Sequence, residues 1–216
     1  MLKADLHIHT CYSIDCGMPL ERIVARCLQL GINCVAIADH HSIAGALELQ
    51  EIAPFRVIVA EEIRTPLGEL MGLFLTEEVP RGLSAQETID RIKSQGGLVN
   101  IPHPFGHLPR GNNKLLTEEI LSQADLIEVF NSRVPFPNSA ARASKLASKY
   151  RLPASAGSDA HTVPEIGRAY VEMPEFNGAE DFLRCLNQGK ISGRRSSPLV
   201  HFTSMRWRMK KRWLPG

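Results

Sequence analysis

Residues 4–10 read Ala-Asp-Leu-His-Ile-His-Thr and place two histidines at the end of a short apolar run. The run Ala4–His9 has the length and composition of a buried strand. Residues two apart in a strand lie on the same face, so His7 and His9 can bind the same metal ion. We expect the loop that starts at Thr10 to return Asp15 to the same site.

Six further apolar runs predict strands, and most of them end in histidine or carboxylate residues. The runs are Cys34–Ala38, Arg56–Glu61, Leu70–Leu75, Leu98–Pro102, Leu126–Phe130 and Pro153–Gly157. The polar residues at or just after their ends are Asp39, His40, Glu61, His103, Asp159 and His161. Sites built from the C-terminal ends of many strands are typical of a β/α barrel, whereas an open sheet concentrates its site at one switch point.

Helical patterns lie between most of these strands and favour an α/β fold with a parallel sheet. The predicted helices are Leu20–Leu30, Thr88–Ser94 after a capping box at Ser84, a short helix opened by Thr117, Ser139–Tyr150 and Ala179–Asn187. We expect residues 1–200 to form the barrel and residues 201–216 to be a basic C-terminal tail.

Composition excludes several classes of protein. The chain has 216 residues, 44% of them hydrophobic and 22% charged, as in globular proteins rather than disordered or fibrous ones. No apolar run is long enough to form a transmembrane segment, and the N-terminus lacks the apolar stretch of a signal peptide. Five cysteines, an odd number with irregular spacing, favour a reducing compartment, so we expect the protein to be cytoplasmic.

Charge is divided unevenly along the chain. Residues 1–189 hold 17 Lys and Arg against 23 Asp and Glu, a net charge of −6, whereas residues 190–216 hold 8 basic residues and no acidic one. A protein that binds nucleic acid over its whole surface would be basic throughout. The basic and apolar residues of Met205–Leu214 could contact nucleic acid, an anionic membrane surface or the acidic body of the protein.

The clustered histidines and carboxylates predict a metal site. A single histidine beside a strand is usually a hydrogen-bonded structural residue, but two His-x-His-like pairs with further His and Glu residues at strand ends are hard to explain in that way. Buried imidazole and carboxylate groups cost free energy unless they are paired or bind metal. Mixed His and carboxylate ligands suit manganese, iron or zinc, and the lack of Cys pairs argues against structural zinc.

These motifs, in this order, resemble those of the PHP (polymerase and histidinol phosphatase) family. The matching segments are Asp5-Leu6-His7-Ile8-His9-Thr10, Ala38-Asp39-His40-His41-Ser42, the strand-ending Glu61, Pro102-His103-Pro104 and Gly157-Ser158-Asp159-Ala160-His161. The resemblance implies a distorted seven-stranded (β/α)7 barrel with a multinuclear metal centre that hydrolyses phosphoesters.

The resemblance also implies which residues bind metal. One ion would be bound by His7, His9, Glu61 and Asp159, a second by Asp15, His40 and His161, and a third by His103 with Glu61 as the bridging ligand. Members with three metals usually have a further histidine after the bridging Glu. Residues 68–74 contain none, although Glu69 could take its place. We therefore expect two or three divalent ions.

The expected reaction is hydrolysis of a small phosphoester, such as a phosphorylated metabolite or nucleotide. A hydroxide between the metals would attack phosphorus while the metals neutralise the phosphoryl oxygens. We expect Asp39 to orient a coordinated histidine, and His103 to be either a ligand or the acid that protonates the leaving oxygen. Arg133 and Arg110, on loops near strand ends, are candidate phosphate-binding residues.

Two alternatives stay open. The first is a regulatory protein that keeps its metal site without turnover. The intact ligand positions argue against this alternative, and the missing third-site histidine favours it slightly. The second is a hydrolase of C–N bonds, because related barrels with His-x-His on the first strand have this activity. No predicted strand ends in a lysine that could bridge two metals, which argues against the second alternative.

Overall fold

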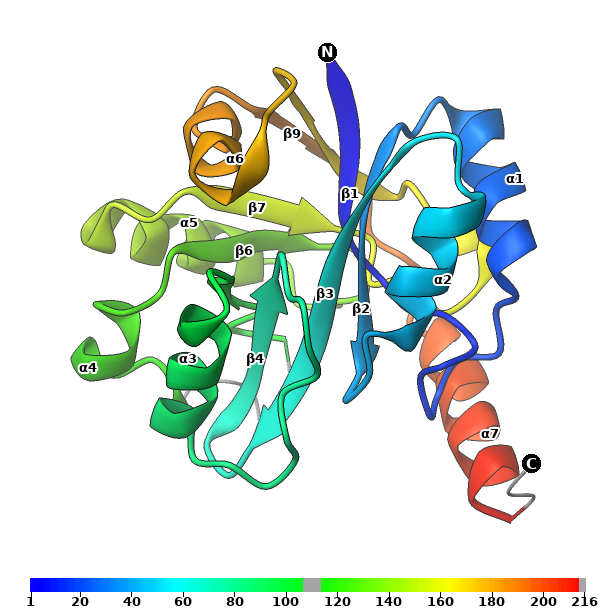
Figure 1. The fold of residues 1–216 in the computed structure, drawn as a ribbon, viewed down its shortest axis with the longest axis horizontal. Coiled ribbons are helices and arrows are strands. Elements are labelled where there is room, and N and C mark those ends of the chain that lie inside the picture. The colour runs from blue at the N-terminus through cyan, green and yellow to red at the C-terminus, as the bar shows by residue number, and fades with distance from the viewer. Residues whose placement is uncertain (107–113, 214–216) are drawn as a thin grey trace.

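Nine strands form one mixed sheet that curls into a nearly closed barrel in the computed structural model, which describes residues 1–106 and 114–213 (Figure 1). The order in the sheet is β7-β6-β5-β4-β3-β2-β1-β8-β9. The strands are β1 (Leu2–Ile8), β2 (Cys34–His40), β3 (Arg56–Thr65), β4 (Gly68–Leu73), β5 (Leu98–Ile101), β6 (Leu126–Asn131), β7 (Ala154–Gly157), β8 (Ala169–Met173) and β9 (Lys190–Gly193).

The barrel closes where the chain after β7 meets the end of β1. Strand β8 pairs with the first residues of β1 only, which leaves the last residues of β1 available to β7. The amide of Asp159 donates to the carbonyl of His7 at 2.7 Å, and the amide of His9 donates to the carbonyl of Ala160 at 3.0 Å. These bonds bring the first and last motifs of the sequence side by side.

All seven predicted strands are present, but the predicted count of seven is not confirmed, because β8 and β9 extend the sheet to nine strands in the described residues. The sheet is also not wholly parallel. Strand β4 is antiparallel to β3 and β5, and β8 is antiparallel to β1 and β9. A two-residue turn, Pro66-Leu67, joins β3 to β4, and so short a connection permits only an antiparallel pair.

Seven α-helices and a short 3-10 helix accompany the sheet in the described residues (Figure 1). They are α1 (Leu20–Leu30), α2 (Ala44–Ile52), α3 (Ala85–Ser94), α4 (Glu118–Leu121), α5 (Ser139–Tyr150), η2 (Val163–Glu165), α6 (Gly178–Leu186) and α7 (Val200–Trp213). The two helix ends that were predicted from capping residues are confirmed. Gly31 ends α1 at φ 65°, and Ser84 and Glu87 form the capping box of α3. Helix α2 was not predicted, and Ile43 before it makes no side-chain cap hydrogen bond.

None of the helices in the described part of the chain is both long and apolar enough to cross a lipid bilayer.

Apolar side chains form two cores, one inside the barrel and one between the sheet and the helices. Successive side chains of a strand point alternately into the barrel and toward the helices. Ala38 and Ala60 therefore belong to the inner core, inside the barrel, and Ile37 and Val59 to the outer core, under the helices. Small residues suit the narrow barrel interior. The inner core is closed at the end away from the C-termini of β1–β3 by three phenylalanines in edge-to-face contact, Phe74, Phe176 and Phe182.

Most of the predicted basic tail is helix α7, which lies against the loop that follows β1 (Figure 1). Trp207 packs on Gly17 so closely that a Cβ atom at position 17 would lie 2.2 Å from the indole. The Lys211 ammonium donates to the carbonyls of Cys11 and Ser13. The helix therefore covers part of the barrel mouth, where the predicted ligands lie.

Candidate metal centre

A cavity of about 280 Å³ lies between the C-terminal strand ends and α7, and histidines and carboxylates line it. The strands bring together seven of the eight predicted metal ligands here, in three overlapping groups. Within each group the potential ligand atoms lie within 4.8 Å of one another. The groups are His9, Asp15, His40 and His161; His7, Glu62 and His103; and His7, His9 and Asp159.

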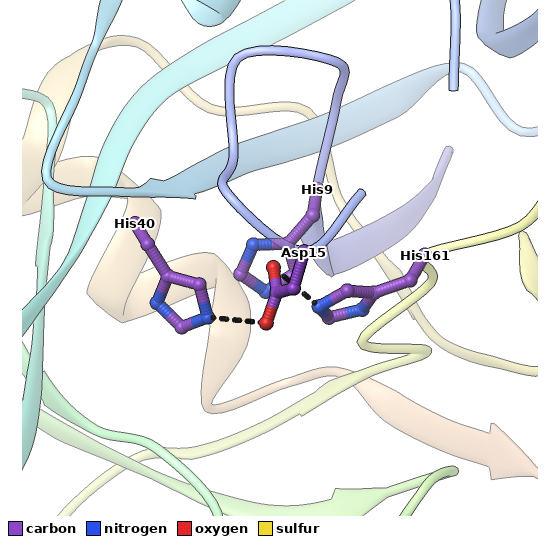
Figure 2. A group of neighbouring side chains, drawn as sticks. All are labelled: His9, Asp15, His40 and His161. Atoms are coloured by element: carbon purple, nitrogen blue, oxygen red, sulfur yellow. Dashed lines mark ion pairs between the residues drawn. The ribbon is translucent and has the colours of Figure 1, made fainter. Parts of the chain in front are cut away.

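The first group surrounds the carboxylate of Asp15 (Figure 2). His40 Nε2 lies 3.4 Å from Asp15 Oδ2, and His161 Nε2 lies 3.3 Å from Asp15 Oδ1. The His9 ring lies beside that of His161, with ring centroids 4.2 Å apart and the ring planes tilted by 35°. The loop after β1 thus returns Asp15 to the histidines of β1 and β2, as predicted.

Glu62 belongs to the second group and also faces histidines of the other two groups. Its Oε1 is 2.8 Å from His103 Nε2, and its Oε2 is 3.3 Å from His40 Nδ1. The same Oε2 lies 3.5 Å from His9 Nε2 and 3.6 Å from His7 Nε2. One carboxylate therefore faces four imidazole rings.

Glu61, the predicted bridging ligand, does not lie in this cluster, and the neighbouring Glu62 lies there instead. Alternation along β3 points Glu62 into the barrel with Ile58 and Ala60, opposite His40 of β2. Glu61 points the other way and accepts a hydrogen bond from the amide of Val79 at 2.9 Å.

Two residues that the sequence analysis missed hold the β1 histidines in orientation. His7 Nδ1 lies 3.2 Å from Glu128 Oε1, and His9 Nδ1 lies 3.0 Å from Ser13 Oγ. Such partners fix which ring nitrogen carries the proton and leave Nε2 free for the centre. Glu128 could have been found, because it follows the inner-core residue Leu126 by two positions on β6.

Asp39 lies outside the cavity. Its two oxygens accept hydrogen bonds of 2.6 Å from the amide and the hydroxyl of Thr10, so it holds the loop after β1 rather than a histidine. Asp5 has a similar place and accepts from the amides of Ser158 and Gly167 at 2.8 and 2.9 Å. Both carboxylates position the loops that carry the ligands.

The charges of the cluster depend on one another. Burial lowers the pKa of His40 and His103, but Glu62 and other carboxylates outweigh burial and raise both pKa values to about 9. Burial and the charge of His161 lower the pKa of His9 to about 3. Burial opposes ionisation of Glu62, yet the imidazoles of His7 and His40 hold its pKa well below the usual value. The carboxylate is therefore ionised, as a cation site requires.

The donor set fits divalent metal ions. His7 Nε2 and His9 Nε2 face each other at 3.1 Å, a contact that a shared cation would stabilise. Asp15 Oδ1 is buried and makes no hydrogen bond. His103 and Asp159 adopt positive φ angles of 27° and 53°, and such strained backbones cluster at functional sites. Imidazole nitrogens with carboxylate oxygens suit manganese, iron or zinc.

Of the two arginines predicted to bind phosphate, the structure describes one. Arg133 lines the cavity but is only 6% exposed, and its Nη2 donates to Ser204 Oγ at 2.8 Å and to the Val200 carbonyl at 3.0 Å. Arg110 lies outside the described residues. Glu69 also lines the cavity, 4.0 Å from His103 Nε2, where a further ligand was expected.

Two protein-family models match the chain. The PHP domain model matches residues 5–96, and the PHP-associated model matches residues 137–191. The protein MJ0417 of Methanocaldococcus jannaschii, described as uncharacterised, is 36% identical over 181 residues. That match covers 82% of this chain and 72% of the relative.

Solved structures share the fold at low identity. A two-domain protein from Bacteroides vulgatus that contains a PHP-like metal-dependent phosphoesterase has a TM-score of 0.73 at 17% identity, over 89% of this chain and 65% of that one. The lesion-specific endonuclease EndoQ of Pyrococcus furiosus has a TM-score of 0.64 at 17% identity, over 88% and 57%. The chain spans less than two thirds of either structure.

Proposed function

The chain belongs to the PHP family, and from this premise we propose that it hydrolyses small phosphoesters, such as a phosphorylated metabolite or a nucleotide, in a metal-dependent reaction. The observation that carries the proposal is the convergence of imidazoles and carboxylates around Glu62 at the barrel mouth. We keep the cytoplasmic location predicted from the cysteine pattern as part of this proposal.

The clustered residues offer ligands for two ions. One would be bound by His9, Asp15, His40 and His161, and another by His7, Glu62 and His103, with Asp159 beside both. Divalent ions there would lower the pKa of water and neutralise the charge of a phosphoryl group. Glu69 is the residue that could complete a third site, so we propose two or three manganese, iron or zinc ions.

The chain's own residues have supporting roles in this proposal. Glu128 and Ser13 keep the β1 histidines oriented, and Asp39 holds the loop that carries Asp15. We assign His103 as a ligand rather than an acid, because its Nε2 faces the same carboxylate as the Nε2 of His7. Arg133 remains a candidate for contact with the phosphate, and Arg110 remains a prediction from sequence.

Cleavage of nucleic acid is the second candidate, because endonuclease Q, solved with a duplex that carries an abasic lesion at its active site, shares the fold at a TM-score of 0.68. The basic residues of α7 would supply contacts to phosphates. A metal-binding regulatory protein without turnover and a C–N bond hydrolase are the remaining alternatives.

Turnover of p-nitrophenyl phosphate tests the proposal. Protein stripped with a chelator should be inactive, and manganese, iron(II) or zinc should restore hydrolysis. Magnesium added alone to the stripped protein is a suitable comparison, because it prefers all-oxygen ligands. Metal uptake without hydrolysis of any phosphoester would instead support the regulatory alternative, and cleavage of an amide substrate would support the C–N hydrolase.

A further inference from the structure

Helix α7 supplies one wall of the metal cavity. His201, Ser204, Met205 and Arg208 line it, facing the histidines and carboxylates of the strand ends. The helix is fastened at both ends: Val200 and Ser204 accept from Arg133, and Lys211 donates to the loop after β1. Its position over the cavity is therefore built from specific contacts.

Among the described residues, Arg208 is the one Lys or Arg side chain of α7 that lines the cavity. The Nη2 of Arg208 lies 2.6 Å from Asp15 Oδ2, whereas Arg206, Lys210 and Arg212 are exposed and do not line it. The Arg208 side chain is 54% exposed, and its guanidinium has five N–H donors, of which the contact with Asp15 uses few. It is a cation placed beside a metal ligand with donors to spare.

Arg133 has less capacity to bind a ligand. Its Nη1 contacts His161 Nδ1, its Nη2 donates to α7, and its Nε lies 3.2 Å from Glu165 Oε1. Because all three guanidinium nitrogens of Arg133 have partners, this side chain positions its neighbours. Arg208 has one such contact, so its guanidinium can turn toward an incoming anion.

Resting on the proposed function, we propose that Arg208 binds the phosphoryl group of the substrate and that α7 restricts the site to small phosphomonoesters. Planar guanidinium groups bind phosphate oxygens in pairs, and the neighbouring metals would hold the remaining oxygens. A cavity of about 280 Å³ is at the small end of ligand pockets. Arg133 holds the helix that presents Arg208.

The test compares Arg208→Gln and Arg208→Lys with Arg206→Gln, an exposed arginine of the same helix that does not line the cavity. Manganese content, the kcat and KM for p-nitrophenyl phosphate, and the inhibition constant of inorganic phosphate are measured for each. We expect Arg208→Gln to raise KM and the inhibition constant by about tenfold to a hundredfold with unchanged metal content. Arg208→Lys should recover part of this loss, and Arg206→Gln should match the native protein.

Equal KM values and equal phosphate inhibition for Arg208→Gln and Arg206→Gln would overturn the proposal while leaving the phosphoesterase intact. Loss of manganese in Arg208→Gln would also overturn it, since Arg208 would then support Asp15 rather than bind substrate. If the native protein hydrolyses no phosphoester, calorimetric titration of the manganese-loaded variants with inorganic phosphate still decides whether Arg208 binds the anion.

Substrate size is tested with a labelled single-stranded oligonucleotide. The native protein should hydrolyse p-nitrophenyl phosphate and leave the internal phosphodiesters intact, because α7 forms one wall of a cavity of about 280 Å³. Cleavage of the oligonucleotide at a comparable rate would show that α7 does not restrict the site.

Discussion

The two walls of the metal cavity are built in different ways. On the barrel side, His7, His9 and Glu62 are at most 2% exposed and belong to or follow hydrogen-bonded strands. On the other side, α7 is held by side-chain contacts and has one buried residue, Ser204. The comparison teaches that the candidate ligands, which need fixed geometry, lie on or next to the sheet, whereas the residue proposed to meet the substrate lies on a helix held by a few side-chain contacts.

Removal of a ligand from the barrel wall should have the largest effect. His9→Ala or Asp159→Ala removes one of the facing nitrogen or oxygen atoms from the cluster, so metal content and phosphoester turnover should both fall to background. Elemental mass spectrometry and a phosphatase assay on the same sample check this. Full activity in either variant would contradict the assignment of the centre.

Glu61 and Glu62 are neighbours on β3 and offer a matched comparison, because only Glu62 points into the barrel. Glu62→Gln removes the charge that faces four imidazoles, and we expect kcat to fall about a hundredfold or more. Glu61→Gln keeps the acceptor for Val79, and burial already raises the pKa of Glu61 to about 7, so activity should stay within about threefold. The reverse result would restore Glu61 as the ligand.

A Glu128 variant tests whether metal affinity depends on residues that contact the candidate ligands from behind. Glu128→Gln weakens the contact that orients His7 Nδ1, and it should lower metal affinity by about tenfold to a hundredfold. Isothermal titration with manganese measures this change. Affinity equal to that of the native protein would mean that the strand alone orients His7.

The smallest effect concerns how firmly α7 is seated. Burial raises the pKa values of Cys16 and Cys34 to about 12, so at pH 8 both thiols stay protonated and react slowly. Raising the pH toward 12 should speed alkylation of both thiols, because the thiolate fraction grows.

Trp207→Ala removes the indole from Gly17. It should speed alkylation of Cys16 severalfold and leave that of Cys34, in the inner core, unchanged. Mass spectrometry of alkylated peptides gives both rates, and equal changes at the two cysteines would indicate a general loss of stability instead.

The strand ends were predictable from sequence because short apolar runs and their polar ends are local signals. The choice between Glu61 and Glu62 was not made correctly, because both faces of β3 are apolar and buried, so alternation alone does not say which face is inside. The alanines at positions 38 and 60 are a signal that could have decided it, because small residues at alternate positions of two paired strands suit the inner face of the barrel.

Helix α7 could not be placed from sequence for a different reason. Its basic and apolar residues do not sort into a clear apolar stripe, and several of its contacts are single polar pairs with distant partners such as Asp15, 193 residues away. Strands β8 and β9 were missed as well. Each is short, and β9 has no fully buried residue that would give an apolar run.

A titration of metal-free protein with manganese, followed by hydrolysis of p-nitrophenyl phosphate, tests the central claim most directly. Activity should be absent without metal and should rise to a plateau at two or three manganese ions per chain. Turnover that persists in the metal-free protein, or a fully loaded centre that hydrolyses no phosphoester, would contradict the assignment of this cavity as a phosphoesterase site.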